Sequence, residues 1–178
     1  MATPPTFSSG AVLTAAQMNS VGLWLVKTQT VGNAVTSVTV TGAFSADYDS
    51  YKIIYTGGSG TINDQIRMTL GGSTGGYYSA LNYVFYSGAT GVLTGNGIAY
   101  WNVGSQKTVG NSIDIDIHNP FLGDETWFNG HYVGVQAGGV VGAIAGYHDQ
   151  GLSYSAFTLT AGAGTITGGT IKVYGYRN

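Results

Sequence analysis

Eight acidic residues and three histidines are the side chains of this 178-residue chain that could support acid–base or metal chemistry. Asp114, Asp116 and His118 recur at every second position, so an extended strand would present all three on one face. Asp47 and Asp49 repeat the same spacing. Carboxylates placed in this way stand about 6.5–7 Å apart, a separation that suits the two acids of an inverting glycoside hydrolase. Any polar strand face produces the same spacing, so the pattern does not by itself indicate an active site.

Cation binding is the second chemistry that Asp114, Asp116 and His118 could support. Ca²⁺ takes roughly six to eight oxygen ligands, usually from a loop that wraps around the ion, which a straight strand cannot do. Only copies meeting on a threefold axis could bring more of these ligands together. The chain has no cysteine for a thiolate metal site or nucleophile. We therefore predict no catalytic, cofactor-binding or metal site, and expect that the protein is not an enzyme.

The composition favours strands over helices. Charged residues make up 8% of the chain, against about 25% in an average soluble domain, and 30 residues are glycine. Lysine, arginine and glutamate, which build helix surfaces, are scarce. We predict an all-β fold, an antiparallel, jelly-roll-like β-sandwich over residues 23–178, with glycine-rich turns between short strands. The predicted strands cover residues 24–30, 35–40, 51–56, 62–70, 77–86, 98–103, 112–118, 126–135, 140–147, 154–160 and 165–176.

Residues 1–22 form a separate N-terminal arm in this prediction. Thr14 and Gln17 have the spacing of a capping box, with Thr14 as the N-cap and Gln17 at the third helical position. The helix that they begin is short and ends near Gly22.

Aromatic residues are the most prominent candidates for binding. The chain has thirteen tyrosines and three tryptophans, and the segment 77–86 carries aromatic side chains on both of its faces. A strand buried on one side has no need of this, so the second face is expected to meet another subunit or a ligand. The predicted receptor-facing residues are Tyr78, Asn82, Tyr86 and Trp101.

Charge and hydropathy limit the partners. A net charge of −2 offers no basic surface for nucleic acid or anionic lipid. No apolar segment is long enough for a membrane helix, and the N-terminus lacks the basic region of a signal peptide. We expect no nucleic-acid binding and no membrane insertion. A surface so poor in charge favours assembly into an oligomer.

Several stretches resemble a family of small bacteriophage virion proteins, the minor tail proteins and tail fibres. The segment Leu13-Thr-Ala-Ala-Gln-Met-Asn19 is similar to the N-terminal segment of many phage tail appendages. The resemblance extends over residues 7–26, 40–54, 119–122 and 165–178. It implies a trimeric β-sandwich, assembled in the cytoplasm of the bacterial host and attached to the virion through its arm, with docking by Phe7, Leu13, Met18 and Trp24.

The function expected from this resemblance is attachment of a virion to a glycan or protein on the host surface. A capsid decoration or head-fibre protein is an alternative that has the same sequence features. A carbohydrate-active enzyme on the same scaffold is a third, and it would need paired acids in a cleft.

Overall fold

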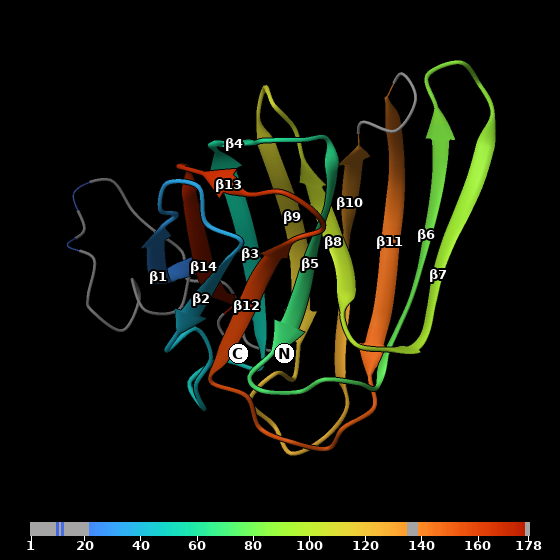
Figure 1. Ribbon diagram of the computed structural model, residues 1–178. Coiled ribbons are helices and arrows are strands. Elements are labelled where there is room, and N and C mark those ends of the chain that lie inside the picture. The colour runs from blue at the N-terminus through green and yellow to red at the C-terminus, as the bar shows by residue number, and fades with distance from the viewer. Residues whose placement is uncertain (1–9, 11, 13–21, 135–138, 177–178) are drawn as a thin grey trace.

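A computed structural model describes residue 10, residue 12, residues 22–134 and residues 139–176 (Figure 1). These residues form fourteen strands and no helix, and so present no helix that could span a membrane. The all-β prediction is confirmed, whereas the helix predicted before Gly22 lies outside the described residues. The strands are β1 (Leu23–Thr30), β2 (Ser37–Thr41), β3 (Ser50–Gly57), β4 (Ser59–Gly60), β5 (Asp64–Leu70), β6 (Tyr77–Phe85), β7 (Thr90–Ile98), β8 (Trp101–Gln106), β9 (Asn111–His118), β10 (Thr126–Gly134), β11 (Val140–His148), β12 (Ala156–Ala161), β13 (Ile166–Thr167) and β14 (Thr170–Tyr176).

Twelve of the described strands pair into one antiparallel network that branches at β9. β9 pairs along its length with β3 and with β10, whereas it meets β8 only at the Ser105–Ser112 pair. The order β2-β12-β5-β8 is called the short branch below, and the order β1-β14-β3-β9-β10-β11-β6-β7 the long branch. In Figure 1 the long branch runs from β1 at one edge to β7 at the other.

Alternating burial gives the strands one inner and one outer face. In β9, Ile113, Ile115 and Ile117 are buried, while Asp114 and Asp116 between them are partly exposed. This confirms the alternation predicted from the sequence. The same period of two continues in β3, β5, β12 and β14, so both branches contribute apolar side chains to a common core.

Aromatic rings join the two branches across this core. Phe44, which follows β2, contacts Tyr51 of β3 with ring centroids 4.9 Å apart and Phe157 of β12 at 5.7 Å. Trp101 of β8 packs 4.5 Å from Phe128 of β10. Each ring removes a large apolar area from water, so these contacts hold the short branch against the inner face of the long branch.

The placement of Trp101 corrects its prediction as a receptor-facing residue. The side chain is 0% exposed. Its indole Nε1 donates hydrogen bonds to the carbonyl oxygens of Tyr78 and Tyr147, both at 3.2 Å. An indole has only this one donor, and here it is used inside the protein. Trp101 is therefore a core residue, out of reach of an external ligand.

β7 is the longest strand missing from the predicted set. Its three glycines, among them Gly91, disfavour a strand because they add no side chain to pack. The neighbouring strand supplies the missing contact: a Cβ built on Gly91 would lie 2.4 Å from the ring of Tyr83. The Tyr83 ring covers this glycine, which explains how the segment forms a strand at the edge of the sheet.

The strand predicted over residues 165–176 is interrupted. Gly168 and Gly169 have φ angles of 67° and 84°, in the left-handed region that favours glycine. They separate β13, which pairs with β4, from β14, which lies between β1 and β3.

His148, at the end of β11, is fully buried and connects the loop between β5 and β6 to the sheet. Its Nε2 lies 3.0 Å from the Gly75 carbonyl oxygen and 2.8 Å from Ser73 Oγ. Because the carbonyl only accepts, Nε2 carries a proton and donates it. The ring also packs 4.2 Å from that of Tyr77. Burial lowers the pKa of His148, against the opposing effects of the Gly75 hydrogen bond and the charge of Asp149.

We predict that His148 makes the folded protein less stable as the pH falls. The unfolded chain, with a histidine pKa of about 6.5, binds the proton before the folded chain does. The free energy of unfolding should therefore decrease from about pH 7 downwards, and this contribution should be constant above pH 7. Thermal unfolding is measured between about pH 5 and pH 8, on both sides of this pKa. The unfolding temperature should depend less on pH in His148→Asn than in the wild type. His131→Asn, at an exposed histidine, is the control; equal slopes in both variants would refute the assignment.

Candidate functional site

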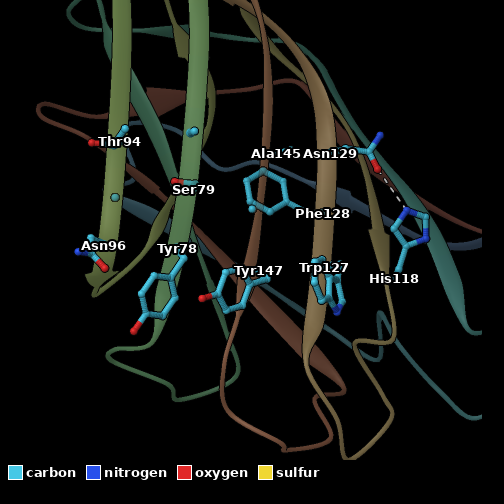
Figure 2. A pocket seen from close by; sticks show the side chains of 13 residues that line it. Tyr78, Ser79, Thr94, Asn96, His118, Trp127, Phe128, Asn129, Ala145 and Tyr147 are labelled. Atoms are coloured by element: carbon cyan, nitrogen blue, oxygen red, sulfur yellow. Dashed lines mark hydrogen bonds between the residues drawn. The ribbon is translucent and has the colours of Figure 1, made fainter.

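The outer face of the long branch carries three aromatic side chains side by side. The strand register pairs Trp127 of β10 with Tyr147 of β11, and Tyr147 with Tyr78 of β6. They therefore lie at one level on three adjacent strands, as Figure 2 shows. Tyr78, Tyr147 and Trp127 are called the aromatic row below.

Contacts within the aromatic row hold its rings in place. The rings of Tyr78 and Tyr147 are stacked, with centroids 4.8 Å apart and planes 5° from parallel. Trp127 lies 5.5 Å from Tyr147 at 32° and remains 50% exposed. The spacing of neighbouring strands, about 4.8 Å, matches the stacking distance. The sheet thus presents an ordered aromatic surface to solvent.

Beside the aromatic row the surface is hollowed because the neighbouring residues are small. Ala80, Ala145, Gly95 and Gly146 line a shallow groove of about 670 Å³. On the inner face of β10 and β11, a Cβ on Gly146 would lie 2.7 Å from the Phe128 ring, so the absent side chain leaves room for Phe128 to pack against β11. We call this hollow, with the aromatic row along it, the aromatic groove.

Polar side chains lie at both ends of the aromatic groove. Thr94 and Asn96 of β7 line one end, and Asn129 of β10 and His118 of β9 line the other (Figure 2). His118 Nε2 lies 3.2 Å from Asn129 Oδ1, and its Nδ1 lies 2.9 Å from Ser50 Oγ. Because the amide oxygen only accepts, Nε2 donates to it, and in the neutral ring Nδ1 then accepts from Ser50. This pair holds the Asn129 amide in a defined orientation.

No aspartate, glutamate, lysine or arginine is among the described residues that line the aromatic groove. At one end, the carboxylate of Asp149, more than burial, raises the pKa of Tyr78. The groove therefore offers apolar contact and neutral hydrogen-bonding groups, and its lining provides no carboxylate pair for acid–base catalysis.

The acid pair of β9 lies next to the groove and is neutralised by a lysine. Lys52 Nζ of β3 lies 2.5 Å from Asp114 Oδ1 and 3.6 Å from Asp116 Oδ2. Burial would lower the pKa of Lys52, but the two carboxylates outweigh it and raise the pKa. Tyr176 donates a hydrogen bond of 2.5 Å to Asp116, and burial followed by this carboxylate raises the pKa of Tyr176 to about 12. The position that a cation would take between the two acids is held by an ammonium group.

The described residues bring together no group of three or more histidine, aspartate or glutamate side chains suited to a metal ion. Asp47 and Asp49 do not share a strand face either, because they lie in the turn before β3. Ser45 Oγ donates to Asp47 Oδ2 at 2.9 Å, which makes Asp47 part of that turn.

At the far end of the same outer face, the exposed side chains are valines and not aromatic residues. Val133, Val141 and Val84 are cross-strand neighbours in β10, β11 and β6, and Val92 follows on β7. Their exposed fractions are 41%, 41%, 43% and 62%, respectively. These four residues, called the valine patch, form an exposed apolar surface of the kind that marks an interaction site.

The other predicted site residues are spread over the molecule. Asn82 lies on the outer face between the aromatic row and the valine patch and lines a second shallow hollow. Tyr86 follows β6 and is 67% exposed outside the groove. Trp24 belongs to β1 at the opposite edge. Phe7, Leu13 and Met18 lie outside the described residues.

Sequence analysis found Tyr78 but missed its partners, Trp127 and Tyr147. Alternation in 126–135 separates Trp127 and Asn129 from Phe128, but it does not say which set faces the core. Pairing the segment with 140–147 by period would have placed Trp127 opposite Tyr147. This cross-strand pairing is the feature of the sequence that could have identified the aromatic row.

We predict that Lys52→Met lowers the free energy of unfolding by about 1–2 kcal/mol. The substitution leaves two partly buried carboxylates close together without a cation, and adding Asp116→Asn should recover part of the loss. Lys172→Met, at an exposed lysine of the adjacent strand, should change stability by less than about 0.5 kcal/mol. Urea unfolding of the variants measures these differences; equal effects of both lysine substitutions would contradict the role of Lys52.

Comparison with known proteins supplies no family for this chain. Family models, curated proteins and solved structures were each compared with it, and none matches.

Proposed function

We propose that this chain is a bacteriophage virion structural protein of the tail fibre or minor tail type, and that a trimer of it attaches the particle to the host surface. The proposal starts from the sequence resemblance at both ends of the chain. The observation that carries it is the uncharged aromatic groove, because packing within one chain does not require Trp127 to remain half exposed there.

The finer fold belongs to the same proposal: residues 23–178 form a jelly-roll-like β-sandwich. The passage of the chain between the branches supports it. Consecutive strands change branch at β1–β2, β2–β3, β5–β6, β7–β8, β8–β9 and β11–β12, whereas β6 and β7 form a hairpin within the long branch. A jelly roll distributes its strands between two sheets in this manner. The aromatic contacts between the branches would then be the core between the two sheets.

The valine patch supports assembly. A free monomer would leave these apolar side chains in water on a protein with few charged residues. A symmetric contact between copies would cover them. Three copies would also present three grooves, and multivalency strengthens attachment when each single site binds weakly.

The proposed docking and attachment surfaces lie at opposite edges of the long branch. This supports an orientation in which one edge faces the particle and the other faces outwards. Trp24 lies on β1, at one edge of the long branch, and the aromatic groove reaches β7 at the other edge (Figure 1). Seven strand spacings separate β1 from β7, roughly 34 Å along the sheet. A chain docked through residues 1–22 and the β1 edge would direct the groove away from its attachment point.

Removal of residues 1–20 tests the docking role. We expect the truncated protein to retain its β-sheet circular dichroism spectrum and to be absent from purified particles, because three of the four proposed docking side chains, Phe7, Leu13 and Met18, are lost. Mass spectrometry of particles measures incorporation, with the full-length chain as the control. Incorporation of the truncated protein at the normal copy number would refute docking through the arm. A normal copy number that matches the capsid instead of the tail would favour the decoration or head-fibre alternative.

Val92→Asp tests the valine patch. A charge at this exposed position should dissociate the trimer, because a buried carboxylate without a partner is strongly unfavourable at an interface. Val109→Asp is the matched control, since Val109 is 89% exposed and lies outside the patch. Light scattering at micromolar concentration reports the oligomeric state. A monomeric wild type, or a trimeric Val92→Asp variant, would contradict the proposed assembly.

A further inference from the structure

We propose that the aromatic groove binds a neutral oligosaccharide, with Tyr78, Tyr147 and Trp127 contacting the apolar faces of the sugar rings. The inference deepens the proposed function, on which it rests, by naming the chemical class of the surface ligand and the residues that bind it.

The groove has both kinds of surface that a sugar requires. A pyranose presents C–H groups on its faces and hydroxyl groups around its edge. The aromatic row and the alanine floor, Ala80 and Ala145, supply apolar contact. Asn96 and Asn129 at the two ends can each donate and accept hydrogen bonds. Ligand sites commonly combine a mostly apolar lining with a few polar groups that orient the ligand.

Charge in and around the groove favours a neutral ligand. The described lining residues include no lysine or arginine that could pair with a uronate, sulfate or phosphate. His118, the lining residue with a titratable ring nitrogen, has both nitrogens in contact with Ser50 and Asn129. The carboxylate of Asp149 acts on Tyr78 at the edge of the groove and would repel an acidic sugar. The hydroxyl groups of a neutral sugar need no cationic partner and are not repelled by this carboxylate.

The dimensions fit several linked sugars. Lining residues come from β9, β10, β11, β6 and β7, which are consecutive in the sheet. Four strand spacings correspond to about 19 Å, and the hollow of about 670 Å³ lies within the usual range for ligand sites. The groove is shallow, so a chain of sugars could continue beyond it in either direction.

The binding residues are held in position before a ligand arrives. Tyr78 and Tyr147 are stacked on each other, Trp127 packs on Tyr147, and the Asn129 amide is oriented by His118. All of them project from paired strands, so little side-chain entropy remains to be lost on binding. This favours useful affinity from a small contact area.

The test uses the purified full-length protein on an array of neutral and acidic bacterial oligosaccharides, followed by isothermal titration with the strongest neutral binder. We expect neutral oligosaccharides to bind in preference to acidic ones. Trp127→Ala and Tyr147→Ala should each weaken binding by about tenfold or more. Tyr86→Ala, at an exposed tyrosine outside the groove, should bind like the wild type. Circular dichroism and light scattering verify that each variant keeps its fold and oligomeric state.

Three results would overturn the inference: no neutral oligosaccharide binds, acidic ones bind preferentially, or binding is unchanged in the Trp127 and Tyr147 variants. If Trp127→Ala dissociates the oligomer and the wild type binds no sugar, the groove is instead a contact between copies. Particle incorporation is measured separately. Saccharide binding by a chain that no particle contains would therefore disprove the virion role and leave the binding site intact.

Discussion

Cross-strand register in the long branch is the constraint on which both the core and the outer surface depend. Side chains alternate between the two faces of a sheet, so a slip of one residue would exchange the inner and outer sets of a strand. In β10 such a slip would place Trp127 in the core and Phe128 in solvent. The isoleucines of β9 oppose it, because they pair with buried side chains of β3 on one side and lie beside β10 on the other. The same register that buries the isoleucines therefore aligns the aromatic row.

The aromatic residues consequently have two separate roles. Trp101, Phe128 and Tyr77 fill the space between the branches, and their contacts are internal. Trp127 of β10 and Tyr147 of β11 lie on the outer face, where their rings contact each other and Trp127 is half exposed. Because Gly146 has no side chain, the Phe128 ring packs closely against β11 on the inner face, directly behind the strands that carry Trp127 and Tyr147. A surface built on paired strands is more rigid than one built on loops.

Charge is concentrated beside the aromatic groove and not in its lining. Lys52 with Asp114 and Asp116 forms a compact group on β3 and β9, beside the groove but not in its lining. Its ammonium neutralises two acids that would otherwise stand unpaired on one strand face, and Tyr176 adds a hydrogen bond to Asp116. The outer face thus divides into a charged band, a neutral aromatic groove and an apolar valine patch. The charged band is satisfied by its internal ion pair, whereas the groove and the patch are the surfaces on which the proposed ligand binding and assembly depend.

Local sequence was sufficient where a strand alternates apolar with charged side chains. The alternation in Ile113-Asp-Ile-Asp-Ile-His118 predicted a strand with one buried face, and low charge with many glycines predicted an all-β chain. Tertiary structure decided which strands lie next to each other. It placed Trp101 inside, made a strand of Thr90–Ile98 by covering Gly91 with Tyr83, and assembled Tyr78, Tyr147 and Trp127 from three separate strands. The physical reason is that periodicity is a property of one segment, whereas burial and neighbourhood depend on residues far away in the chain.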